Sequence, residues 1–259
     1  MSRRTTVVVL IATLVVLVSF AAAQTPPVSD PQAVAYAAQS ITATVGSLSI
    51  SDVTLTGSVT WNGSDTGTAT MRALGTGESR MDLALTSGTR TEIRDAQTGT
   101  LLGKWIAPDS TSGNYASQNC WTDSVWFFPP LGALALGPNV VLSYVGQETR
   151  NEASVQHLQS YLYQAGQFPS PTPQQLSTMD FYLDATTLLP TAITFNAHPD
   201  NDATTSLLIE VDFSDYQSIG GAVVPTHIQR YQQGTLMVDV VVTGATFNTG
   251  LPLSLFTIN

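Results

Sequence analysis

Residues Asp52–Trp61 read DVTLTGSVTW, a segment in which apolar and hydroxyl-bearing residues alternate. Val53, Leu55 and Val59 occupy one set of alternate positions, and threonine or serine fills the positions between them. A period of two places alternate side chains on opposite faces of a β-strand. We therefore expect a half-buried strand here and a fold that is mainly β.

Similar segments continue along the chain, separated by turn residues such as Asn62-Gly63. Consecutive strands with short turns and no helix between them favour an antiparallel sheet over a parallel α/β one. The strands that we predict span residues 68–74, 80–85, 89–94, 101–105, 139–146, 153–163, 179–183, 190–196, 206–212, 222–232 and 235–247.

Helical signals are few. Asp30 followed by Pro31 is typical of an N-cap and a first helical position, and the alanine-rich residues 32–39 favour a short helix. Residues 173–179 are expected to form one or two helical turns, whereas residues 107–120 are polar and are predicted to be a loop. The sequence thus predicts an α+β fold with a small helical share.

The most apolar segment after the N-terminal region is residues 124–136, SVWFFPPLGALAL. Pro129 and Pro130 exclude a regular central strand here and would start or kink a helix. Two interpretations remain open for this segment. It is either buried core, which we favour, or a lid whose Trp126, Phe127 and Phe128 line the mouth of a cavity.

The N-terminus has the three parts of a secretory signal peptide. Arg3 and Arg4 are basic, Val7–Phe20 is almost entirely apolar, and Ala21–Ala23 supplies the small residues of a cleavage site. The apolar part has about 14 residues, fewer than the roughly 20 that span a bilayer. The alternatives are an uncleaved anchor and, less favoured, a twin-arginine signal.

We therefore expect a signal peptide at residues 1–23, a mobile leader at 24–29 and a single domain at 30–259. The mature protein is predicted to be periplasmic or extracellular, with no stable membrane insertion after cleavage. Without Arg3 and Arg4, seven basic residues face 19 acidic ones, a net charge of about −12. Such a charge disfavours nucleic acids and anionic lipid surfaces as partners.

Residues that would carry catalysis or bind a cofactor are sparse. Cys120 is the single cysteine, which excludes an intramolecular disulfide and is typical of a buried small residue. His157, His198 and His227 are too far apart in sequence for a helical zinc motif. No nucleophile elbow, phosphate loop or dinucleotide motif occurs. We predict no catalytic residue, no metal and no cofactor.

Asp200 and Asp202 place carboxylate oxygens close together and raise the question of a calcium site. The glycine and the distant glutamate of an EF-hand loop are missing. A solvated hairpin tip is the favoured interpretation.

Several short segments of the C-terminal third carry a family resemblance. They are Phe181-Tyr182-Leu183-Asp184 with Thr187 and Pro190, then Gly220-Gly221-Ala222-Val223-Val224-Pro225 before Ile228, and Asn248 with Leu251 and Phe256. In these features, over residues 179–259, the chain resembles the LolA/LolB-like lipoprotein carriers of the periplasm. The resemblance implies an unclosed antiparallel β half-barrel, helices across its concave face and an apolar cavity for acyl chains. Arg72 is the candidate, by position, for the arginine of that family's N-terminal strands.

We therefore hypothesise an exported protein that binds an apolar small molecule, a lipid or an acyl chain without bond chemistry. The alternatives are a β-sandwich interaction module of the cell envelope and, less favoured, a hydrolase. The sequence does not assign an oligomeric state. The residues that we expect to line the cavity or its lid are Trp61, Trp126, Phe127, Phe128, Leu131, Ile209, Val211 and Phe213.

Overall fold

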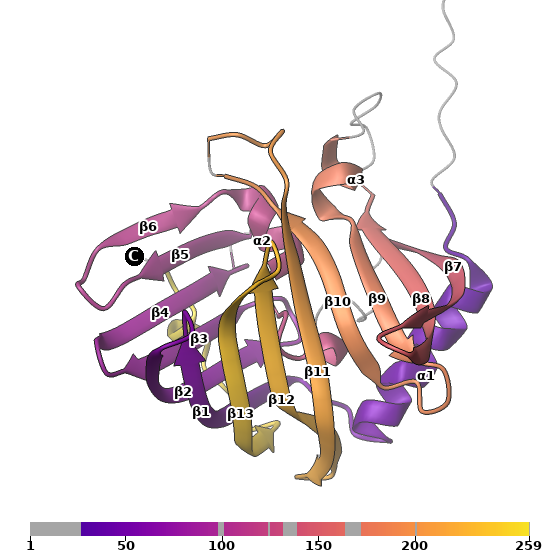
Figure 1. The fold of residues 1–259 in the computed structure, drawn as a ribbon, viewed down its shortest axis with the longest axis horizontal. Coiled ribbons are helices and arrows are strands. Elements are labelled where there is room, and N and C mark those ends of the chain that lie inside the picture. The colour runs from indigo at the N-terminus through magenta and orange to yellow at the C-terminus, as the bar shows by residue number, and fades with distance from the viewer. Residues whose placement is uncertain are drawn as a thin grey trace, which may run out of the picture.

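A single antiparallel sheet dominates the structure, a computed structural model that describes residues 27–97, 101–123, 125–131, 139–163, 172–199 and 201–258 (Figure 1). Its 13 strands follow the order β6-β5-β4-β3-β2-β1-β13-β12-β11-β10-β9-β8-β7. The strands are β1 Asp52–Trp61, β2 Asp65–Leu74, β3 Ser79–Leu85, β4 Gly88–Asp95, β5 Leu102–Ile106, β6 Ser112–Tyr115, β7 Val140–Arg150, β8 Ala153–Leu162, β9 Met179–Asp184, β10 Pro190–Ala197, β11 Leu207–Ile219, β12 Ala222–Gln232 and β13 Thr235–Phe247.

The sheet consists of two meanders that meet in its middle. Strands β1 to β6 form the N-terminal half, and β7 to β13 form the C-terminal half. The halves join where β1 pairs with β13, from Val53 opposite Phe247 to Trp61 opposite Val238. A bulge at Gly57 interrupts this pairing, and a side chain there would collide with the carbonyl oxygen of Val241 at 2.1 Å. Glycine therefore allows the close approach that joins the two halves.

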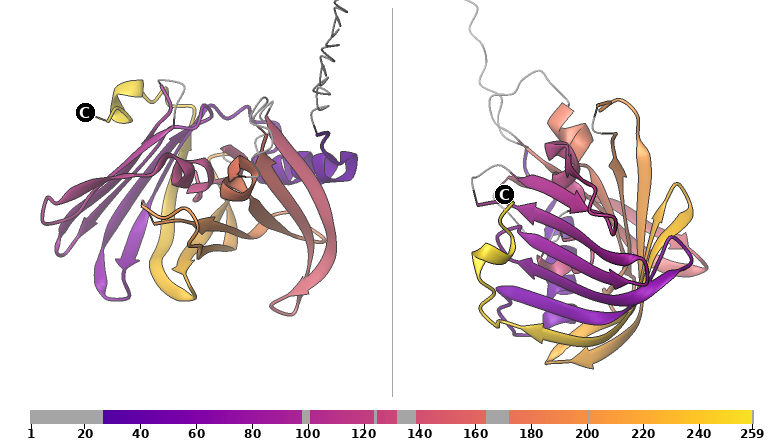
Figure 2. Two further views of the ribbon diagram at one scale, coloured as in Figure 1. Left: turned by 90° about the horizontal axis from the view of Figure 1, so that it is seen from above. Right: turned by 90° about the vertical axis from the view of Figure 1, so that its left-hand side faces the viewer.

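The sheet is curved and its two edge strands, β6 and β7, do not pair with each other. Figure 2 shows the two halves as the walls of an open trough, with α2 (Ser117–Asp123) and α3 (Thr172–Ser177) between them. The predicted unclosed half-barrel is confirmed. The alternative β-sandwich is wrong, because the described strands form one continuous sheet rather than two packed ones.

One helix connects the two walls of the trough, and another packs within a single wall. The helix α2 contacts both β5 and β10, which lie in different halves of the sheet, and α1 contacts β12 and β7. Asp30 caps α1 as predicted, because its carboxylate accepts a hydrogen bond from the amide of Gln32 at 2.8 Å. The helical segments are α1 Pro31–Val45, α2 Ser117–Asp123, η1 Pro129–Leu131, α3 Thr172–Ser177 and η2 Leu253–Leu255.

Several local predictions need correction. The strands predicted at 139–146 and 206–212 continue to Arg150 in β7 and to Ile219 in β11. The helix at 32–39 continues to Val45, because Ala37, Ser40 and Thr44 keep a buried face beyond the alanine-rich part. The predicted loop at 107–120 contains the strand β6 and the first residues of α2. We did not predict this short edge strand because its residues are polar. It pairs with β5 on one side only.

The hydrophobic core fills the inner side of the sheet. It is a cluster that takes residues from α1, from strands of both halves and from the segment 125–131. Phe127 is 1 % exposed and Phe128 0 %, so the interpretation of this segment as core is confirmed for its described residues. Pro129 begins a short 3-10 helix, as expected of the paired prolines. Residues 124 and 132–136 of the predicted segment lie outside the described residues.

The described chain starts at residue 27, so the expected signal peptide and cleavage site lie outside it. Ser29 and Asp30 are already tied to β7: the amide of Asp30 donates to the carbonyl of Leu142 at 2.8 Å, and the amide of Leu142 donates to Ser29 Oγ at 3.1 Å. None of the helices within the described ranges has the length and hydropathy needed to cross a bilayer.

Candidate functional site

The eight predicted ligand-contacting residues all belong to the inner side of the trough. Seven are buried in the core cluster, and Trp61 is partly buried against it. Trp61 and Ile209 line one hollow, and Trp126 lines another. The remaining five pack inside the cluster and line neither hollow; they are Phe127, Phe128, Leu131, Val211 and Phe213.

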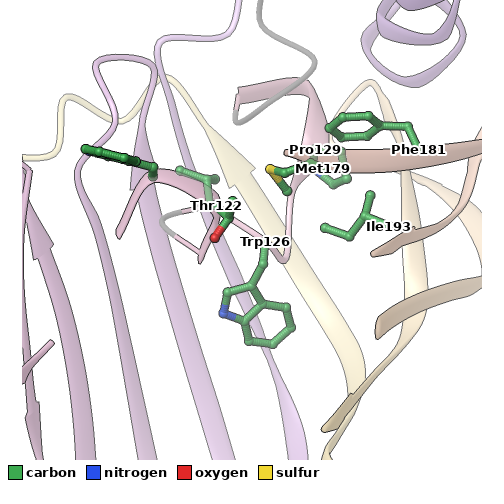
Figure 3. A pocket seen from close by; sticks show the side chains of 8 residues that line it. Thr122, Trp126, Pro129, Met179, Phe181 and Ile193 are labelled. Atoms are coloured by element: carbon green, nitrogen blue, oxygen red, sulfur yellow. The ribbon is translucent and has the colours of Figure 1, made fainter. Parts of the chain in front are cut away.

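The hollow beside Trp126 is small. It lies where the segment 125–131 meets β9 and β10, with Met179, Phe181 and Ile193 on its walls (Figure 3). Its volume of about 20 Å³ holds roughly one water molecule. Side chains therefore fill the apolar interior at this end of the trough.

A much larger hollow of about 380 Å³ opens further along the same inner face. We call it the large hollow. Both halves of the sheet contribute to it, together with α2 and the residues that follow β10. Its wall combines apolar and polar side chains. The apolar members include Trp61, Trp105, Leu207, Ile209 and Met237, and the polar members include Arg90, Glu92, Asn119, His198 and Arg230.

A buried ion pair forms part of this wall. Arg90 and Glu92 lie two residues apart on β4, so both point to the inner face, and Arg90 donates from Nε and Nη2 to Glu92 Oε1 at 3.0 and 2.7 Å. The side chain of Glu92 is 8 % exposed. Burial alone would raise the pKa of Glu92, but the charges of Arg90, Arg94 and Arg230 outweigh it and hold the pKa below its ordinary value. Glu92 is thus an anion surrounded by cations.

Aromatic rings support the two arginines that line the large hollow. The guanidinium carbon of Arg90 lies 4.3 Å from the centroid of Trp61 and 6.0 Å from that of Trp105. That of Arg230 lies 5.6 Å from the centroid of Trp126. These distances fit cation–π contacts, which hold a guanidinium against an apolar surface.

His198 occupies the loop after β10 and is held firmly. The side chain of Asn119 on α2 accepts from the amide of His198 at 2.8 Å and donates to its carbonyl at 2.6 Å. The ring nitrogen Nδ1 lies 2.8 Å from the carbonyl of Thr205 and therefore donates to it. The other ring nitrogen, Nε2, is buried without a hydrogen-bond partner in the described part of the chain.

The polar side chains of this wall were not predicted from the sequence. Glu92 is surrounded by three of the few basic residues, Arg90, Arg94 and Arg230. Two of them could have been noticed in the sequence, because residues 90–94 read RTEIR and alternate charged with uncharged side chains. That alternation puts three charged side chains on one face of the predicted strand, but the face itself cannot be assigned from a single strand. Arg72, the position suggested by the family resemblance, instead forms an ion pair with Asp82 at 2.9 Å on the other face of the sheet.

The carboxylate of Asp202 bonds to neighbouring residues of its own loop rather than standing as a calcium ligand. Asp202 accepts hydrogen bonds from the amide and hydroxyl of Thr204 and from the hydroxyl of Thr205, and these bonds lower its pKa. Asp200 lies outside the described residues. Over the ranges that the structure covers, no three His, Cys, Asp or Glu side chains converge as metal ligands would.

Comparisons with known proteins find similarity in structure rather than in sequence. No family model and no curated protein sequence matches the chain. A solved structure from Vibrio parahaemolyticus, a domain assigned to outer membrane lipoprotein sorting, superposes with a TM-score of 0.53 at 12 % identity, over 87 % of this chain and 96 % of that one. A LolA superfamily protein from Nitrosomonas europaea gives 0.51 at 11 % identity, over 87 % and 97 %.

At these identities the similarity concerns the fold. It extends well beyond residues 179–259, where the sequence resemblance lies, and includes the N-terminal half of the sheet. Both superpositions therefore support a LolA-like fold for this chain.

Proposed function

We propose that this protein is an exported carrier that binds one apolar or amphiphilic ligand in the large hollow and performs no bond chemistry. The trough provides a concave face that both halves of the sheet line, and the large hollow is the space left on that face. This space is the single observation on which the proposal depends. The superposed structures, one a lipoprotein-sorting domain, support a carrier over the alternatives.

The size of the large hollow limits the ligand. Its volume of about 380 Å³ lies near the lower end of the range for small-molecule pockets, roughly 300–1,000 Å³. The hollow beside Trp126 holds only about 20 Å³ and offers no extension. The space therefore suits one short chain or one small molecule, and not the several acyl chains of a lipoprotein anchor.

The apolar wall supplies the affinity. Trp61 and Ile209 would contact the ligand directly, and Phe127, Phe128, Leu131, Val211 and Phe213 would form the packed layer that supports them. Removing about 200 Å² of apolar ligand surface from water contributes about 5 kcal/mol. This gain must offset the loss of ligand freedom, so micromolar to millimolar binding is expected.

Export belongs to the same proposal. Residues 1–23 would be removed as a signal peptide, residues 24–29 would form a leader, and residues 30–259 would act as one domain in the periplasm or outside the cell. The partner is thus an apolar molecule of the envelope or the medium, and not a nucleic acid.

A pair of adjacent residues on β11 allows a matched test. Leu207 lines the large hollow, whereas Leu208 is 43 % exposed on the other face. Leu207→Trp should fill the hollow and abolish binding of a fluorescent fatty-acid analogue, whereas Leu208→Trp should leave it unchanged. Native mass spectrometry of the purified mature protein with added analogue should show one bound ligand on the native protein and none on Leu207→Trp.

Two results would exclude a carrier. If the native protein neither retains a ligand nor binds the analogue, an interaction module is the better interpretation. If it releases a chemically altered analogue, it is a hydrolase. Equal binding by the two tryptophan variants would place the ligand elsewhere.

A further inference from the structure

We propose that the large hollow selects an amphiphile with a single apolar chain and an anionic oxygen head group, of which a fatty acid is the simplest example. The proposal rests on the proposed function and adds the chemical class of the ligand. Two independent features of the wall lead to it: the sign of its charge and the unsatisfied nitrogen of His198.

The charge of the large hollow is opposite to that of the protein. The chain carries nine basic and 19 acidic residues, for a net charge of −10. Among the residues that the structure describes, the ionised side chains that line the hollow are nevertheless Arg90, Arg230 and Glu92, a net charge of +1 with histidine neutral. A local field of this sign, in a site with apolar walls, attracts an anion and disfavours a cation.

The cations are positioned where a ligand would meet them. Arg90 is held by Glu92 and by the ring of Trp61, and Arg230 lies over the ring of Trp126. A guanidinium fixed in this way loses little side-chain freedom when it binds an oxyanion, and its planar N–H groups match a carboxylate. Of these two rings, that of Trp61 also lines the large hollow and provides apolar surface for the chain of the ligand.

His198 supplies the second feature. It is 4 % exposed and lines the large hollow, and its Nε2 has no hydrogen-bond partner in the described structure. A buried polar atom without a partner destabilises the structure, so the arrangement favours a ligand that satisfies it. Because Nδ1 donates to Thr205, Nε2 of the neutral ring accepts from a hydroxyl, and Nε2 of the protonated ring donates to an anionic oxygen. A head group that bears oxygen satisfies Nε2 in both cases, and an anionic one does so when the ring is protonated.

Three probes share the same ten-carbon chain and differ in the head group: decanoate, decanol and decyltrimethylammonium. Each is titrated calorimetrically into the purified mature protein, below the concentration at which the probe forms micelles. Decanoate should bind at least about tenfold more tightly than decanol, the effect expected of a charged hydrogen bond. Decyltrimethylammonium should bind most weakly. Decyl phosphate, as a fourth probe, distinguishes a carboxylate head from a phosphate head.

Variants of the charged residues test the mechanism. Arg230→Gln should weaken decanoate binding about tenfold and change decanol binding by less than about twofold. Glu92→Gln removes the lining anion and should strengthen decanoate binding, a change of opposite sign that loss of folding cannot produce. Arg72→Gln, on the other face of the sheet, is the matched control and should leave both affinities unchanged.

The outcomes separate this inference from the proposed function. If none of the probes binds, the carrier function itself fails. If all of them bind with similar affinity, the carrier function stands and the selection of an anionic head group is wrong. An Arg230→Gln variant that loses decanoate and decanol equally would also contradict it.

Discussion

Asp212 is partly buried and Glu92 is buried, yet their surroundings shift their pKa values in opposite directions. Burial raises the pKa of Asp212 to about 6, and the negative charge of Glu210, two residues before it on β11, adds to this. Arg150 offsets only part of the effect, because it forms an ion pair with Glu210. Glu92 faces several arginines and keeps a lowered pKa. Neighbouring charge, more than burial, thus decides which carboxylate is stable as an anion.

Asp212→Asn should make the protein more stable at pH 7. Because the pKa of Asp212 is raised on folding, its stabilising contribution is complete below the unfolded value of 3.8 and is lost as the pH rises through about 6. After allowance for solvent screening, the gain at pH 7 should be about 1 kcal/mol. Urea unfolding of variant and native protein at pH 4 to 7 measures it: the difference should be small at pH 4 and grow towards pH 7.

The control for this prediction is Asp215→Asn on the same strand, where the carboxyl side chain is 71 % exposed. It should change the free energy of unfolding little at any of these pH values. A difference between native protein and Asp212→Asn that stays constant from pH 4 to pH 7 would show that the charge of Asp212 is not the cause.

At the scale of elements, β6 is an edge strand that shapes the large hollow. Gly113 lies opposite Trp105 on β5, and a Cβ atom there would lie 2.8 Å from the indole ring. Glycine therefore leaves room for the ring, which lies against Arg90 and lines the large hollow. An otherwise weak strand thus positions one wall of the site.

Gly113→Ala should displace Trp105 and lower the affinity for an anionic amphiphile several-fold, with a loss of stability of about 1–3 kcal/mol from the steric conflict. Calorimetric titration with decanoate, together with thermal unfolding, measures the two effects. Asn114→Ala, at the next and exposed position of β6, is the matched control. Unchanged decanoate binding by Gly113→Ala would show that Trp105 does not form part of the site.

Alternation in the sequence predicted most strands, but it ended β7 and β11 too early and missed β6. The predicted bounds 222–232 and 235–247 coincide with β12 and β13, because hydrophobic residues recur there at every second position. The strand β6 has only four residues, of which Gly113 and Asn114 have low strand propensity, so tertiary pairing decides its conformation. Local patterns therefore predict a strand only over the residues that show its alternation.

The candidate site could be predicted only in part for a related reason. Trp61 and Ile209 were predicted from hydrophobic patterns and do line the large hollow. Arg90, Arg230 and His198 come from β4, β12 and a loop, and only the folded sheet brings them together. Their meeting depends on the pairing of β1 with β13, a contact between residues almost 200 positions apart, for which no local pattern exists.

At the scale of the whole molecule, this pairing makes the two halves of the sheet one folding unit. Leu55 on β1 is fully buried at the junction, opposite Ala245 of β13 and Met71 of β2. The core cluster around it includes residues from both halves and from α1. With one continuous sheet and a shared core, neither half has a complete hydrophobic surface of its own to bury. Unfolding of the halves should therefore be coupled.

Leu55→Ala tests this coupling. Loss of a fully buried leucine should cost about 2–5 kcal/mol, and a coupled molecule should show that loss in every strand whose amides exchange by global unfolding. Hydrogen exchange with mass spectrometry should thus reveal the same decrease of protection in β2 and β3 as in β11 and β12. Thr56→Ala, the exposed neighbour on the same strand, should change protection little. A loss of protection confined to β1–β6 would mean that the trough consists of two independently stable walls, and that the hollow between them can open without unfolding.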